Sequence, residues 1–432
     1  MILIIYTTLY REGGDKFARA ARTLADDKRR EHPGIEVRAE AVESKADVVA
    51  QFRRVEEEGG AINELHFIGH SGMYGPMFRT RAMPEQFSPH EWRTLSIPFA
   101  PDAKAYFHAC RTARWFAPFF ARTFNVPAYG YHWYTTVSTR PDRFRWERLS
   151  PRRDGPVYIL GCPGRKSHGL VGSLGKYVTG KAETLKRFDP HPPEGDPTYD
   201  SVAELYDQVF EDITVREDEW RWLDRVLPRE PLRVLDMGCG NGALLLQLGG
   251  RVAHGVGVDA SAGMIERARL RAAGRPNLEF VHITGPELPF PDASFDVITS
   301  LLSFRYLDWD PVMMELRRVL KPGGRLLIVD MVTVPVRWRE MPRVAADAAR
   351  ALAGRRRRRR FGQRLRTMVT DPRWQTMLRY NPIRAEHEMK WYLESRFPGR
   401  KVETINMGMN ARVLAFDSGP LEPGTVAPQS YP

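Results

Sequence analysis

The stretch RVLDMGCGNG (233–242) decides the fold of the second half of the chain, because a buried-strand pattern runs directly into a cluster of glycines. The helix-like segment ALLLQL (243–248) follows. Glycines at this position allow a tight turn and a close approach of the backbone to a ligand, and a helix N-terminus offers N–H groups. A dinucleotide-binding fingerprint would need its third glycine at position 243, where this chain has Ala243. The pattern therefore predicts a nucleotide-type site with Gly-x-Gly-x-Gly spacing.

A second strand pattern, GVGVDAS (255–261), ends in Asp259, which lies 259 − 242 = 17 residues after the last glycine. A carboxylate at that strand end can accept both hydroxyls of a ribose. A glycine-rich turn alone is weak evidence, but the acidic strand end strengthens the prediction.

Five further features agree with such a site. They are the helical segment with Tyr199 and Tyr206, then DASAGMIERAR, LPFPDASFDVI, KPGGRLLIVD and the hairpin formed by KVETIN and RVLAFD. In this order they resemble the class I S-adenosylmethionine-dependent methyltransferases, in particular the branch with the ubiquinone and menaquinone methyltransferases. The resemblance covers about 198–418 and implies a Rossmann-like, seven-stranded αβα domain with S-adenosylmethionine as cofactor.

The resemblance also implies which positions hold the cofactor. The methionine end would contact Asp236, Gly238, Cys239 and Gly240, the ribose Asp259, the adenine Ala260, Met264, Thr284 and Gly285, and Ser300 would lie near the sulfonium. The family often has Gly-Asp-Ala where this chain has Ile-Thr-Gly (283–285), so adenine recognition here must use a hydroxyl or backbone amides. The alternative is a Rossmann-like sheet that has lost its ligand.

Methyl transfer from a sulfonium is an in-line displacement, so the protein has to supply alignment and a dry cavity. A phenol or carbon acid as acceptor would also need a base, and Tyr306, Asp308, His387 and Glu388 are available. A small-molecule methyl acceptor is the leading expectation.

The first 135 residues alternate strand and helix patterns, which predicts a mostly parallel sheet covered on both faces, that is, an α/β fold. Two of its strands end near His70, in ELHFIGHSG (64–72), and Cys110, in AYFHACRTARW (105–115). Neighbouring parallel strands end at the same edge of a sheet, so the two side chains could meet there. A nearby imidazole could then activate the thiol as a nucleophile.

This pattern resembles the caspase-like peptidases, including the bacterial CHAT branch, over about residues 1–140, and implies a three-layer αβα domain with catalytic His70 and Cys110. This chain departs from that family at Ser71, where the family usually has glycine. A hydrolase nucleophile elbow around Ser71 is less favoured because Met73 replaces its last glycine. The other alternative is a buried histidine and thiol in an interaction module that recruits a protein partner.

The expected organisation of the 432 residues is a caspase-like domain (1–150), a linker (151–197) rich in Gly, Pro and charge, a methyltransferase domain (198–418) and a flexible tail (419–432). Three scattered cysteines exclude a disulfide framework, and no metal site is expected. No apolar run approaches the length of a membrane span, so the expected location is cytoplasmic.

The net charge of +12 is concentrated in one stretch. Residues 337–366 contain twelve Arg against Glu340 and Asp347, a net charge of +10. Within it, the run Arg355–Arg360 could attract nucleic acid, an acidic small molecule or an anionic membrane surface, or it could simply be a solvated basic surface. A nucleic-acid methyltransferase guided by this run is therefore a third hypothesis.

Overall fold

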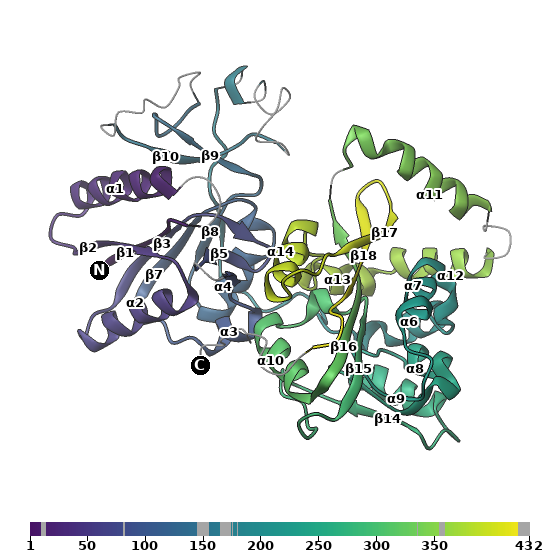
Figure 1. Cartoon of the computed structure of the whole chain (residues 1–432). Coiled ribbons are helices and arrows are strands. Elements are labelled where there is room, and N and C mark those ends of the chain that lie inside the picture. The colour runs from purple at the N-terminus through teal and green to yellow at the C-terminus, as the bar shows by residue number, and fades with distance from the viewer. Residues whose placement is uncertain are drawn as a thin grey trace. The chain divides into compact units, whose positions relative to one another are not determined.

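A computed structural model describes residues 1–9, 14–80, 83–144, 155–164, 174, 176–178, 180–334, 336–353 and 359–421. The chain forms two compact units, one from Met1 to Pro192 and one that begins at Pro193 (Figure 1). Each unit has its own sheet and its own hydrophobic core. No helix in these ranges is long and apolar enough to cross a membrane.

The first unit contains a six-stranded sheet in the order β2-β1-β3-β7-β8-β11. Neighbouring strands are parallel except for β11, which is antiparallel to β8. The prediction of a mostly parallel sheet is therefore confirmed. The strands are β1 (Ile2–Thr7), β2 (Val37–Val42), β3 (Ile62–Ile68), β7 (Phe99–His108), β8 (Ala128–Gly130) and β11 (Lys186–Phe188).

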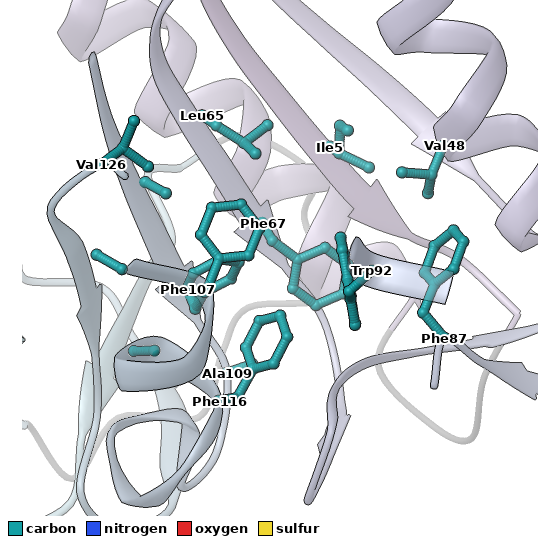
Figure 2. Close-up of a cluster of buried hydrophobic side chains, with 14 of the residues drawn as sticks. Ile5, Val48, Leu65, Phe67, Phe87, Trp92, Phe107, Ala109, Phe116 and Val126 are labelled. Atoms are coloured by element: carbon teal, nitrogen blue, oxygen red, sulfur yellow. The ribbon is translucent and has the colours of Figure 1, made fainter. Parts of the chain in front are cut away.

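Helices cover both faces of this sheet. On one face, the alanines of α1 (Gly14–Glu31) pack on Ile2 and Ile4. On the other face, α2 (Lys45–Glu57), α3 (Pro89–Thr94) and α4 (Phe116–Phe124) enclose a larger, aromatic-rich core (Figure 2). The alternation of apolar residues along β1 explains this division, since Leu3 and Ile5 point into the second core.

Phe107 belongs to an aromatic cluster in that core and is 1% exposed. Its ring lies 4.8 Å from Phe116 and 4.9 Å from Phe120. We expect Phe107→Ala to destabilise the first unit by about 3–5 kcal/mol, because a large cavity remains in a packed core. Amide hydrogen exchange of β1, β3 and β7 in the full chain measures this. Ile35→Ala, at a 39% exposed position, should change the same protection by less than about 0.5 kcal/mol. Equal effects of the two changes would contradict this description of the core.

Two parts of this unit differ from a simple alternation of strands and helices. Residues 126–138 do not form one strand, because they contain β8 and β9 (Thr135–Ser138), which belong to different sheets. The intervening residues instead bond to other loops, for example Trp133 O to the N–H of Arg111 and Tyr134 O to the N–H of Cys162. β9 pairs with β10 (Tyr158–Gly161) in a two-stranded sheet. A second small sheet joins β4 (Ser71–Gly72), β5 (Gly75–Arg79) and β6 (Pro84–Gln86).

The expected linker at 151–197 is also corrected by the structure, because this segment contains β10 and β11. β11 extends the sheet of the first unit through the pairs Lys186–Gly130, Arg187–Tyr129 and Phe188–Ala128. The division between the units consequently falls between Pro192 and Pro193. Of the expected tail, residues 422–432 lie outside the described ranges, while Leu421 is hydrogen-bonded to Gly323 and Gly324.

The second unit contains a seven-stranded sheet in the order β14-β13-β12-β15-β16-β18-β17. β18 is antiparallel to both of its neighbours, and the other neighbouring pairs are parallel. The expected seven strands and closing hairpin are thus present. The strands are β12 (Leu232–Met237), β13 (Val252–Asp259), β14 (Leu278–His282), β15 (Phe295–Leu301), β16 (Leu320–Thr333), β17 (Glu403–Met407) and β18 (Ala411–Asp417).

Helices again cover both faces, which gives three layers. One face carries α7 (Glu217–Val226), α8 (Ala243–Leu248) and α9 (Ala262–Arg271), and the other carries α10 (Trp309–Val319) and α14 (Glu386–Arg396). Between β16 and β17 the chain also forms α11 (Met341–Ala353), α12 (Arg359–Thr370) and α13 (Pro372–Tyr380). α12 and α13 pack with α6 (Ala203–Val209) in a separate apolar cluster.

Candidate functional site

The glycine turn after β12 has a backbone that other residues adopt only under strain. Gly238, Gly240 and Gly242 have φ angles of +73°, +52° and +76°. At Gly238 a Cβ atom would lie 2.3 Å from the Cβ of Ser303. The N–H groups of Gly238 and Cys239 both donate to the carbonyl oxygen of Val258, at 2.8 and 3.0 Å. These bonds fix the turn against the end of β13.

Asp259 ends β13 and is held by two backbone donors. Its Oδ2 accepts from the N–H of Gly240 at 2.9 Å, and its Oδ1 accepts from the N–H of Ser261 at 2.8 Å. Burial raises the pKa of Asp259, although both bonds oppose that effect. Each carboxylate oxygen keeps a free lone pair, so the ionised group can accept from two further hydroxyls. This is the donor pattern that a ribose diol presents.

Asp236 and Cys239 lie deeper in the same turn. Burial raises the pKa of Asp236 to about 7, and Thr299 Oγ1 donates to its Oδ1 at 2.8 Å. Burial, together with the carboxylates of Asp259 and Asp236, raises the pKa of the Cys239 thiol well above its ordinary value. Cys239 therefore remains a neutral thiol and fills space.

The raised pKa of Asp236 predicts a pH dependence of stability. The folded pKa of about 7 lies above the ordinary 3.8, so the folded state keeps a proton that the unfolded chain loses. Stability should therefore fall as pH rises from about 4 to about 7 and stay level above, with a total on the order of a few kcal/mol. We expect Asp236→Asn to remove this part of the pH dependence, as measured by amide hydrogen exchange of β12, β13 and β15.

Asp296→Asn is the matched control in the same sheet. Burial raises the pKa of Asp296, but Lys321 and the N–H of Arg233 together lower it by more than burial raises it. The net shift of the pKa is therefore downward. Its contribution is lost only at lower pH, where the lowered pKa is crossed. Asp236→Asn variants that keep the wild-type slope between about pH 4 and 7 would contradict the assignment.

These residues open on one cavity of about 720 Å³ in the second unit. Seven of the ten predicted cofactor positions line it: Gly238, Gly240, Asp259, Ala260, Met264, Thr284 and Gly285. Asp236 and Cys239 line a small adjoining cavity of about 20 Å³.

Ser300 lines neither of these two cavities, whereas Ser303 lines the large one. The Oγ atoms of Ser300 and Ser303 are 2.8 Å apart, and Ser303 Oγ donates to the carbonyl oxygen of Met237 at 2.7 Å. Sequence reasoning missed Ser303 because Leu302 has a left-handed backbone, with φ +60°, which a leucine does not signal. That turn changes which side chain after β15 faces the cavity.

The far side of the cavity is apolar and aromatic. Tyr199 and Tyr306 meet there, with the Tyr199 hydroxyl donating to the Tyr306 hydroxyl at 3.0 Å. The Tyr199 ring is also 6.1 Å from that of Trp374 in α13. Burial raises the pKa of Tyr199 well above its ordinary value. The remaining apolar lining from α12 and α13 is Phe361, Leu365, Met368, Val369 and Leu378.

The four candidate bases lie in two different places in the structure. Tyr306 and Asp308 line the cavity, whereas His387 and Glu388 lie in α14 and are not among its lining residues. Sequence reasoning also missed Arg305, a cavity residue that donates through Nη1 to Asp330 Oδ1 at 2.6 Å. The signal for this pair was Asp330 itself, a charged residue that ends the apolar run RLLIVD.

In the first unit, strand register brings the loops of His70 and Cys110 together. Ile68 of β3 pairs with His108 of β7, so each candidate follows the paired residue by two positions. Ser71 Oγ donates to the carbonyl oxygen of Cys110. Cys110 Sγ accepts from the N–H of Thr135 at 3.3 Å.

The turn after Cys110 carries backbone strain, since Arg111 has φ +60°. The imidazole of His70 packs edge-on against Phe17 at 5.1 Å between ring centroids. Across the described ranges of both units, no cluster of three or more His, Cys, Asp or Glu side chains is arranged to hold a metal ion.

Comparison with known proteins finds a family match within the second unit. Residues 235–328 match the family described as "Methyltransferase domain". Over these residues the second unit is similar to methyltransferase domains, and this similarity implies S-adenosylmethionine as the cofactor. The positive-φ glycine turn, Asp259 and the cavity fit that cofactor.

Individual proteins are also similar to part of the chain. A demethylmenaquinone methyltransferase of Clavibacter sepedonicus is 39% identical over 142 residues, which is 32% of this chain and 58% of the relative. A 27-O-demethylrifamycin SV methyltransferase of Amycolatopsis mediterranei is 36% identical over 168 residues, 34% of this chain and 61% of the relative. The chain thus spans about three fifths of the length of these curated relatives. A solved methyltransferase of Aquifex aeolicus is 20% identical, covering 52% of this chain and 99% of its own with a TM-score of 0.34.

Proposed function

We propose that this protein transfers a methyl group from S-adenosylmethionine to a small, largely apolar acceptor. The observation that carries the proposal is the single cavity that runs from the glycine turn and Asp259 to the aromatic wall of α12 and α13. The relatives named for demethylmenaquinone and demethylrifamycin support a small-molecule acceptor.

Each part of the cavity has a distinct task in this proposal. Asp259 binds the ribose hydroxyls, while Gly238 and Gly240 leave room for the methionine part beside the backbone. When bound, the cofactor supplies an activated methyl on a good leaving group, so no protein nucleophile is needed. The apolar wall excludes water and aligns the acceptor for in-line attack.

An acceptor hydroxyl or carbon acid must lose a proton during the transfer. Tyr306 and Asp308 are the two candidate bases that line the cavity. The Tyr199 hydroxyl donates to the Tyr306 hydroxyl and so fixes the position of the Tyr306 oxygen.

The test is incubation of the full chain with methyl-labelled S-adenosylmethionine and an extract of its host, followed by separation of organic, small polar, protein and nucleic-acid fractions. Label in the organic fraction that is absent with Asp259→Ala is the expected result. Label confined to protein or nucleic acid would overturn the small-molecule proposal and favour a macromolecular acceptor.

We further propose that the first unit is a caspase-like domain in which His70 and Cys110 act as a dyad, which would make the protein bifunctional. Two observations support this proposal. His70 and Cys110 each lie two residues after the paired positions Ile68 and His108 of β3 and β7, and the turn at Arg111 is strained. The competing proposal is a non-catalytic module that recruits a partner or the methyl acceptor.

Cys110→Ala distinguishes the two proposals, with Cys162→Ala as the matched control. Cys162 is fully buried, and burial raises its pKa to about 12, so it should be chemically inert. Loss of self-cleavage or peptide cleavage only in Cys110→Ala supports the dyad. Unchanged products and intact partner binding support the module.

A further inference from the structure

Helix α12 has two opposite faces with different chemistry. Phe361, Leu365 and Met368, at helical spacing, line the cavity. Arg359, Arg360, Arg364 and Arg366 are exposed on the remaining surface of the helix. We call these four residues the arginine face. The same helix is thus both a wall of the apolar cavity and a basic surface.

Little negative charge compensates the arginine face. α12 contains no acidic residue. Arg364 Nη1 donates to the carbonyl oxygen of Gln208 at 2.8 Å and lies 3.4 Å from Glu211. Within the described ranges, Arg359, Arg360 and Arg366 have no ion-pair partner, so their charge is available to an external anion.

Two observations in this unit favour a lipid surface over a nucleic acid as the partner of the arginine face. Phe361 is the single aromatic residue of α12 and faces the cavity, so the helix presents no ring for stacking on bases. Trp338, in the short 3-10 helix Trp338–Glu340 that precedes α11, is 78% exposed and is flanked by Arg337 and Arg339. Met341, the first residue of α11, is 45% exposed. Exposed tryptophan and apolar residues among arginines are typical of segments that lie in the membrane interface.

We propose that the arginine face of α12 binds the anionic surface of a lipid bilayer, with Trp338 and Met341 as apolar anchors. In this arrangement the arginine face of α12 would lie on the bilayer surface, and the opposite face of α12 would line the cavity. The protein would then take up an apolar acceptor from the bilayer. The choice of a bilayer rests in part on the apolar acceptor of the proposed function. Vesicle binding is measured without donor or acceptor, so its outcome is separate from that of the methylation assay.

The test is co-flotation of the full chain with vesicles of phosphatidylcholine alone and of phosphatidylcholine with phosphatidylserine. We expect binding only to the anionic vesicles and its loss at high salt. The triple change Arg359→Gln, Arg360→Gln, Arg366→Gln should lower the partition coefficient roughly 100-fold, since each arginine near such a surface contributes about a fivefold factor.

The matched control is Arg221→Gln, Arg225→Gln, Arg379→Gln, which removes the same charge from exposed arginines that have ion-pair partners. It should retain most of the binding, and Trp338→Ala should weaken binding even at low salt. Equal binding by the two triple variants, or binding to neutral vesicles, would overturn the proposal. So would retention on single-stranded RNA together with no binding to anionic vesicles.

Discussion

Replacing Gly238 with alanine is expected to destabilise the second unit by about 2–5 kcal/mol and to abolish cofactor binding. The positive φ of +73° costs any other residue energy, and the new Cβ would lie 2.3 Å from that of Ser303. Gly238 and Ser303 both line the cavity, so a displacement of either residue changes the proposed cofactor site. Thermal unfolding and titration calorimetry with S-adenosylmethionine measure the two effects.

Gly250→Ala is the control for this change, because a Cβ atom there meets nothing within 4 Å. It should leave both measurements nearly unchanged. Ser303→Gly, combined with Gly238→Ala, should restore part of the stability because it removes the clashing atom but leaves the strained backbone. A Gly238→Ala protein with normal stability and binding would show that the turn can relax and does not form the site.

Changing Asp259 to asparagine is expected to weaken S-adenosylmethionine binding at least about 100-fold, since hydrogen bonds to a charged group contribute about 1.5–3 kcal/mol each. An amide retains the shape of the carboxylate but offers only one acceptor oxygen, while Asp259 already accepts from Gly240 and Ser261. Calorimetric titration measures the affinity. Thermal unfolding without ligand measures separately the cost of losing the bond from Gly240 or Ser261, because an amide can accept from only one of them.

Asp224→Asn is a suitable control, because this carboxylate is 57% exposed and pairs with Arg251. Its affinity for the cofactor should equal that of the unmodified protein. If Asp259→Asn binds the cofactor normally, the ribose is held elsewhere and the assignment of this strand end fails.

The parts of the site that could be predicted from sequence are those set by local constraints. Three glycines after a buried strand and an acidic residue at the next strand end leave few other arrangements, and seven predicted positions do line the cavity. Ser303 could not be predicted because its direction depends on the left-handed turn at Leu302. The cavity wall from α12 and α13 depends on long-range packing against α6, which sequence spacing does not encode.

The fold shows the same division between local and distant determinants. Hydrophobic alternation predicts both sheets, since apolar runs of strand length alternate with amphipathic helices. The role of residues 151–197 could not be predicted, because their Gly, Pro and charge content is typical of a linker. β11 is only three residues long and owes its place to the edge of a sheet whose other strands are distant in sequence.

The antiparallel pairing of β11 with β8 determines where the chain can be truncated to give a separate first unit. A fragment that ended at residue 150 would lose β11 and leave the backbone N–H and C=O groups of β8 unpaired along one side. Open edges of this kind join with strands of other molecules and lead to aggregation. A fragment that ends at Pro192 keeps the edge covered, so it is the shorter form suited to separate expression and peptidase assays.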